Sequence, residues 1–129
     1  MTVPVVATYS ATALVDANTS FLDLIDGAAT AGAIKVRDSS DTLLGTITLD
    51  DPSGTVNGTT GQLTFTSPGG DLATAAGVPA YGEMCDGDGV VHLSMPVDEG
   101  TTPTSGYLML NTLTVVDGQV LELASAVVG

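Results

Sequence analysis

The chain has 129 residues and a formal net charge of −13, because fifteen acidic residues face only two cations, Lys35 and Arg37. Two cations cannot neutralise a run of phosphates, so the charge excludes a nucleic-acid-binding surface and argues against an anionic membrane. A single cysteine excludes an intrachain disulfide, and the apolar runs are too short to span a bilayer. We therefore expect a soluble protein made in a reducing cytoplasm, with no nucleic acid and no membrane among its partners.

The composition favours a core of small and β-branched side chains. Hydrophobic residues make up 43% of the chain, yet only 4% of the residues are aromatic and there is no Trp. Deep ligand pockets favour aromatic walls, whereas thin sheet packing suits Val, Leu and Ala. The length fits a single domain over residues 1–129.

The N-terminal part of the chain predicts an arm followed by a helix. Residues 1–10 are apolar, and Pro4 opposes an early helix, so we interpret them as an extended arm. From Thr12 onwards, apolar residues recur at spacings of three and four, and Gly27 is a suitable stop. This pattern predicts one amphipathic helix over residues 12–26.

After the helix, the hydrophobic period changes from 3.6 to 2. Turns rich in Gly, Asp and Thr separate the alternating segments, and Gly77 and Pro79 interrupt the weakest of them, which is typical of a bulge or an edge strand. Seven or eight short strands predict a mainly β chain: an antiparallel β-sandwich over 32–128, jelly-roll-like, with one N-terminal helix. The predicted strands lie within residues 33–38, 43–50, 61–67, 72–84, 90–97, 107–116 and 119–128.

The segment 83–100 gathers the residues with the most reactive side chains, including the single cysteine and the single histidine. Asp86 and Asp88 are weak candidates for a calcium site. However, an EF-hand loop needs ligands at alternate positions and a Glu at the twelfth, where this chain has Val90 and Val97. Asp-Gly pairs are instead a strong signal for a tight hairpin turn. We interpret the segment as a hairpin and predict no metal beyond that weak cation site.

Catalytic arrangements are equally weak in this sequence. A zinc site lacks a second Cys or His, and a Cys85–His92 pair lacks a recognisable oxyanion-hole segment. Alternation over 90–97 places Val91, Leu93, Met95 and Val97 on the core face and His92 on the solvent side, while Cys85 is expected to be buried. We predict a protein that is not an enzyme, with no catalytic residue and no cofactor.

Lys35 and Arg37 alternate with Ile34 and Val36, so both cations lie on one face of a predicted strand. Charges of this kind keep an edge strand from pairing with another copy of itself. The alternative is that the two cations contact an acidic partner surface.

Three segments resemble the small head decoration, or cement, proteins of tailed bacteriophages, whose genes usually lie beside the major capsid gene. FLDLIDGAATAGAIKVRD (21–38) resembles the end of their helix, its small-residue link and the first strand. LLGTITLDDPSG (43–54) resembles the strand and Asp-Pro turn that follow, and LNTLTVVDGQVLEL (110–123) resembles the terminal hairpin. The order and spacing of these motifs carry the likeness, since each of them reflects the fold and none is a catalytic signature.

The resemblance implies a β-sandwich, often a jelly roll, that binds the outside of the shell as a dimer or trimer, with the major capsid protein as its partner. We therefore expect a non-enzymatic cement protein located on the capsid exterior of a virion. We expect the apolar arm to add a strand to a capsid sheet edge and the Lys35/Arg37 face to provide a second contact. The arm residues of this prediction are Val3, Val5, Val6 and Tyr9.

Two alternatives stay open on sequence grounds. One is a virion fibre, tail or adhesin-like β-sandwich that binds a host glycan, assisted by calcium at Asp86 and Asp88. The other is an enzyme that depends on the Cys85 thiol, which predicts a low thiol pKa.

Overall fold

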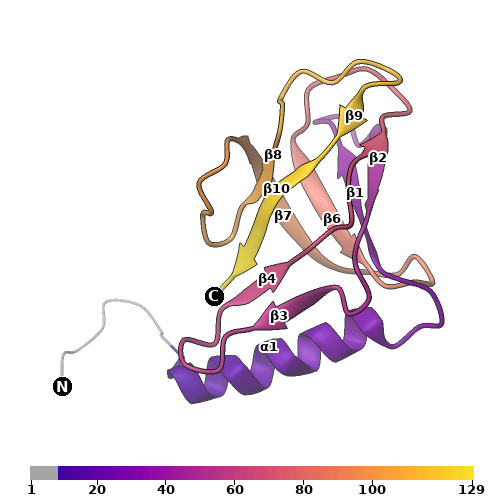
Figure 1. Ribbon diagram of the computed structural model, residues 1–129. Coiled ribbons are helices and arrows are strands. Elements are labelled where there is room, and N and C mark those ends of the chain that lie inside the picture. Colours follow the sequence, from indigo (N-terminus) through magenta and orange to yellow (C-terminus); the bar gives the residue numbers. More distant parts are fainter. Residues whose placement is uncertain (1–8) are drawn as a thin grey trace.

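The computed structural model describes residues 9–129. One helix, α1 (Ala11–Asp26), precedes the strands in the described residues. Figure 1 shows α1 lying across one end of a curled sheet, next to β3 and β4. The strands are β1 (Ala33–Arg37), β2 (Leu43–Thr48), β3 (Gly54–Val56), β4 (Leu63–Phe65), β5 (Asp71–Leu72), β6 (Tyr81–Cys85), β7 (Val91–Glu99), β8 (Leu108–Leu110), β9 (Val120–Leu121) and β10 (Leu123–Val128).

Helix α1 begins and ends close to the positions that the sequence predicts. Ser10 has an extended backbone, and its hydroxyl accepts the Ala13 N–H at 3.1 Å, which caps a free donor of the first turn. The helix ends before Gly27, and Ile25 is completely buried. Its neighbour Leu24 is 50% exposed, so the buried stripe of the helix is narrower than the sequence pattern suggests.

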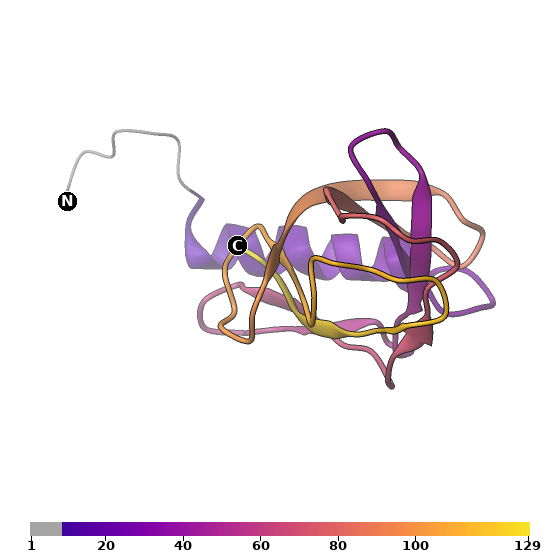
Figure 2. The same cartoon turned by 90° about the horizontal axis from the view of Figure 1, so that it is seen from above.

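The mainly β fold with one N-terminal helix is confirmed, and it is sandwich-like. Eight strands form one curled sheet in the order β2-β1-β6-β7-β8-β10-β4-β3. Seen from above in Figure 2, the strands curl around the core while α1 crosses beneath them. This order differs from a jelly roll, in which the strands divide between two sheets.

One strand pair departs from the predicted antiparallel arrangement. β8 runs parallel to the end of β7, with Val97 opposite Leu108 and Glu99 opposite Leu110. The intervening loop turns the chain back on itself, and it carries Gly100 and Gly106, both with positive φ. Glycine tolerates this backbone conformation because it has no Cβ. The sheet is therefore mixed, because β8 lies alongside the end of β7 in the same direction.

The two outer strands of the large sheet are covered by other parts of the chain. Beyond β2, the Leu44 carbonyl accepts the Thr74 N–H at 2.8 Å, in the segment that follows β5. On the other side, α1 packs against β3. β5 and β9 pair with each other as a small second sheet. Covering the edges in this way protects a sheet from pairing with another chain.

The core lies inside the curl and is aliphatic, as the composition predicts. Phe65 is the large exception, and its ring packs edge-to-face against Phe21 of α1, with ring centroids 6.2 Å apart. This contact joins the helix to β4. The completely or almost completely buried side chains come from both ends of the sheet order and include Ile34, Leu44, Ile47, Leu63, Met84, Leu108, Leu110 and Leu121.

Candidate functional site

The segment 83–100 forms the predicted hairpin. β6 and β7 pair antiparallel, and the turn between them runs from Asp86 to Gly89. The Asp86 N–H donates to the Val90 carbonyl, and the Gly89 N–H donates to the Asp86 carbonyl, each at 3.0 Å. Gly89 has a φ of +85°, the left-handed conformation that such a turn requires.

The Asp86 carboxylate holds this turn together. Its Oδ1 accepts the N–H groups of Asp88 at 2.9 Å and Val90 at 3.0 Å. Its Oδ2 lies 2.8 Å from Nε2 of His92. The His92 hydrogen bond, followed by the backbone N–H groups, lowers the pKa of Asp86 below its usual value.

These contacts bear on the calcium prediction for Asp86 and Asp88. Both oxygens of Asp86 already act as acceptors within the turn, and Asp88 is exposed. Calcium takes six to eight oxygen ligands. Within residues 9–129, no group of three or more His, Cys, Asp or Glu residues could hold a metal ion. Calcium at this turn stays a prediction, which a chelator-reversible shift in melting temperature would test.

Cys85 and His92 do not form a pair. The Cys85 side chain is 1% exposed, and its Sγ lies 3.6 Å from the Glu83 carbonyl oxygen. Burial raises the pKa of the Cys85 thiol, and the positive charge of Lys35 only partly opposes this. His92 contacts Asp86 instead. A buried thiol with a raised pKa is a poor nucleophile.

One detail of the predicted hairpin faces is wrong, and it concerns Val91. His92 is half-buried, with Nε2 against the Asp86 carboxylate. Val91, predicted to face the core, is 41% exposed. The register between β6 and β7 shifts between Met84 and Cys85, where Cys85 lies opposite Val91. A bulge re-aims side chains at the end of a ladder, so the simple alternation fails there.

Lys35 and Arg37 lie on an interior strand, so the prediction that they protect an edge is wrong. β1 pairs with β2 on one side and with β6 on the other. Arg37 forms an ion pair with Glu83 of β6 through its Nε, and its Nη1 donates to the Asp41 carbonyl at 3.1 Å. The hydrogen bond to Glu83 raises the pKa of Arg37. Lys35 lies directly opposite Glu83 in the same ladder.

These residues belong to a polar network on the half-buried outer face of β1 and β6. The Tyr81 hydroxyl donates to Asp41 Oδ1 at 2.7 Å, and this hydrogen bond is the main cause of the raised pKa of Tyr81. Arg37 and Tyr81 therefore both contact Asp41, and Arg37 also contacts Glu83. Arg37 is consequently neutralised within the chain, which leaves Lys35 as the better placed of the two cations for an acidic partner.

Among the predicted arm contacts, the structure places only Tyr9, which is 73% exposed. Val3, Val5 and Val6 lie outside the described residues. The predicted strand addition by this arm is therefore not tested by the structure.

An exposed apolar patch on the small second sheet, formed by Leu72 and Val120, was not predicted from the sequence. Leu72 and Val120 are cross-strand neighbours, 63% and 44% exposed, and Val116 in the preceding turn is 58% exposed. Because Leu121 is buried and Val120 is not, alternation in 119–128 could have indicated one exposed apolar position. The pairing of Val120 with Leu72 could not be predicted in the same way, because the two residues lie far apart in the sequence.

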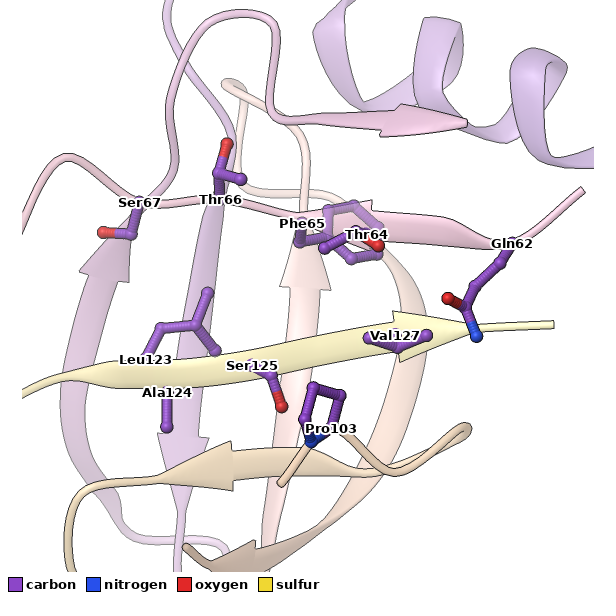
Figure 3. Close-up of a pocket in the computed structure, with 10 residues that line it drawn as sticks. All are labelled: Gln62, Thr64, Phe65, Thr66, Ser67, Pro103, Leu123, Ala124, Ser125 and Val127. Atoms are coloured by element: carbon purple, nitrogen blue, oxygen red, sulfur yellow. The ribbon is translucent and has the colours of Figure 1, made fainter. Parts of the chain in front are cut away.

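A pocket of about 390 Å³ lies between β4, β10 and the loop that carries Pro103, and it was not predicted from the sequence. Figure 3 shows the Ser125 hydroxyl directed toward the Pro103 ring and the Gln62 amide extending toward β10. Ser125 is only 8% exposed, and its Oγ has no hydrogen-bond partner within the described residues. A buried polar group without a partner costs about 1–3 kcal/mol.

In the part of the chain that the structure describes, no helix is both long and apolar enough to cross a membrane. A scan against protein-family models, a search of curated proteins and a search of solved structures each gave no match.

Proposed function

We propose that this chain is a decoration, or cement, protein that binds the exterior of a bacteriophage capsid and stabilises contacts between neighbouring capsomers. Its partner in this proposal is the major capsid protein, and the chain acts as a dimer or trimer on the shell of the virion. The motif resemblance over 21–38, 43–54 and 110–123 suggests this class, and the mainly β fold with one N-terminal helix is compatible with it.

The observation that carries the proposal is where the negative charge lies. All fifteen acidic residues are exposed or half-buried, and none belongs to the core. Of the two cations, Arg37 is paired with Glu83. The surface is therefore anionic over the helix, the turns and the loops. Such a surface repels packaged DNA, so on a DNA-filled particle it belongs on the outside of the shell.

The contacts proposed from the sequence are modified by the structure. Lys35 stays a candidate contact for an acidic capsid surface, whereas Arg37 would have to leave Glu83 and Asp41 to reach a partner. Tyr9, at the exposed start of the described chain, is well placed to join an arm that adds a strand to a capsid sheet. Weak contacts suffice for a cement protein, because many copies each stabilise the assembled shell over its dissociated subunits.

Two measurements test the proposal. Mass spectrometry of purified virions should find this chain in a fixed ratio to the major capsid protein, and a low-resolution map should place it on the outer surface. Shells prepared without the chain should bind it on mixing and disrupt at a higher temperature afterwards. Absence from virions, or failure of intact shells to bind the purified chain, would exclude a cement role.

A matched pair of variants tests the contact residues. Lys35→Gln should weaken shell binding, because it removes the cation that has no hydrogen bond within the described residues. Thr46→Gln is the control, since Thr46 lies beside Lys35 on β2 in the same row of the sheet. If both variants bind shells equally well, Lys35 is not part of the interface. The virion measurements then decide the cement role itself.

A further inference from the structure

The pocket beside Ser125 exists because two neighbouring strands diverge. β10 pairs with β4 only at Val127–Thr64 and Val128–Leu63. Beyond these pairs, residues 65–67 and 123–125 separate, and the Pro103 loop supplies a third wall. The Gly106 N–H donates to the Val127 carbonyl at 2.8 Å, which holds this loop against β10. The opening is thus fixed by backbone hydrogen bonds on two sides.

Ser125 gives the pocket a polar group that the fold itself does not use. Its hydroxyl is directed to the pocket side, toward Pro103, and it has no hydrogen-bond partner within the described residues. Alanine would fit the same position and would avoid leaving a hydroxyl unsatisfied. A buried hydroxyl at a pocket wall is satisfied when a ligand supplies the missing donor or acceptor.

The remaining lining is neutral and rich in hydrogen-bonding groups. None of the ten lining residues is charged. The side chains of Gln62, Thr64 and Thr66 make no hydrogen bond to any other described residue, so they are available at the rim, while Pro103 and Leu123 add apolar surface. A net charge of −13 disfavours an anionic ligand, and the absence of a lining carboxylate gives a cationic ligand no partner.

We propose that this pocket binds a neutral sugar unit of a glycan, with the Ser125 hydroxyl as the buried hydrogen-bonding group. A sugar ring carries hydroxyls that both donate and accept, together with apolar C–H faces, and this combination matches the lining. The pocket volume of about 390 Å³ lies in the range of small-molecule sites. The site is separate from the Asp86–Gly89 turn, and it does not depend on the proposed capsid role.

The test is a nuclear magnetic resonance titration of the full ¹⁵N-labelled chain with glucose, galactose, mannose and N-acetylglucosamine at millimolar concentrations. At least one of these sugars should shift amide signals of residues 62–67 and 123–127 and leave the Asp86–Gly89 turn unchanged. Glucuronic acid, which keeps the ring of glucose and adds a negative charge, should bind more weakly than glucose. No shift at the pocket with any of the four sugars would overturn the proposal.

Two matched variants separate ligand binding from folding. Ser125→Ala should weaken binding by about tenfold, the effect of one good hydrogen bond, without lowering the melting temperature. Ser53→Ala is the control, because Ser53 Oγ is also buried without a partner in the described residues but does not line the pocket. It should leave binding unchanged. If Ser125→Ala does not fold, Gln62→Ala at the half-exposed rim replaces it. Wild-type affinity in the folded pocket variant would overturn the proposal.

Discussion

Asp86 is the residue whose charge state matters most for the β6–β7 turn. We predict that Asp86→Asn destabilises the chain at pH 7, because the variant loses the negative charge that faces His92 and the two backbone N–H groups. The control is Asp88→Asn, whose exposed side chain makes no hydrogen bond in the described residues. It should change the free energy of unfolding by less than about 0.5 kcal/mol. Urea unfolding of the three proteins measures both effects.

The pH dependence of the Asp86 effect has a definite sign. The pKa of Asp86 in the folded chain is lower than the ordinary value of 3.8 for an Asp carboxyl. The folded state therefore binds this proton less readily than the unfolded state, and the charge contributes stability above pH 3.8 that is lost as the pH falls through the folded pKa. The gap between wild type and Asp86→Asn should narrow below about pH 4. A gap that stays constant down to pH 2 would contradict this assignment.

Cys85 provides a second residue-scale prediction. Because the thiol is buried and its pKa is raised, iodoacetamide at pH 7.5 should alkylate the folded chain more than about tenfold more slowly than free cysteine. In urea the rate should recover, which shows that the protection comes from the fold. Mass spectrometry of timed samples measures the rate. Fast alkylation of the folded chain would instead support the alternative of an enzyme that depends on the Cys85 thiol.

At the scale of elements, Asn18 attaches α1 to the sheet. Its Nδ2 donates to the Gly61 carbonyl at 2.6 Å and lies 3.4 Å from the Val128 carbonyl, and the side chain is almost completely buried. We predict that Asn18→Ala lowers the free energy of unfolding by about 1–3 kcal/mol, because a buried carbonyl loses its donor. Equilibrium urea unfolding at pH 7 measures this loss.

The comparison for Asn18 is Ser20→Ala, an exposed change on the same helix. It should stay within about 0.5 kcal/mol of wild type, since it removes no buried contact and alanine favours the helix. If the two variants were equally stable, α1 would be held by its apolar contacts, such as Phe21 with Phe65, and not by the Asn18 hydrogen bonds.

The elements themselves were predictable where the chain signals them locally. The helix over 12–26 and the Asp86–Gly89 turn follow from spacing and from Asp-Gly pairs, and the structure has both. β3 was not predicted, because Gly54–Val56 lies in a segment whose Gly, Thr and Asn content indicates a linker. It is a strand because it pairs with β4. The partner strand lies close by in the sequence, across residues 57–62, but a strand of three residues is too short to show an alternating pattern.

Among the candidate sites, features set by the local sequence were predictable, and features that join distant segments were not. The burial of Cys85 and the turn role of Asp86 followed from the local sequence. The Arg37–Glu83 ion pair, the Leu72–Val120 patch and the pocket at Ser125 each join segments more than 20 residues apart. Ser125 in particular is one small residue in an apolar run. Its unpartnered hydroxyl becomes visible only once β4 and β10 are seen to diverge.

At the scale of the whole molecule, the charge governs the response to salt. Fifteen carboxylates at the surface repel one another, and only two cations oppose them. The Debye length falls from about 30 Å at 0.01 M salt to about 8 Å at 0.15 M, so added salt screens this repulsion. We predict that the melting temperature rises as NaCl increases from 0.01 M to 0.15 M. Thermal unfolding followed by circular dichroism measures it.

A double variant separates this screening from other effects of salt. Asp16 and Asp23 are exposed carboxylates on α1, and Asp16→Asn with Asp23→Asn reduces the net charge from −13 to −11 without removing a buried contact. The double variant should melt at a higher temperature than wild type in 0.01 M NaCl, and the two should converge at 0.15 M, because screening has less repulsion left to remove. A melting temperature that instead falls with salt would mean that attractive pairs such as Arg37–Glu83 outweigh the repulsion. In that case attractive ion pairs would offset the repulsion between the surface carboxylates. Repulsion of packaged DNA would then no longer favour the outer face of the shell for this chain.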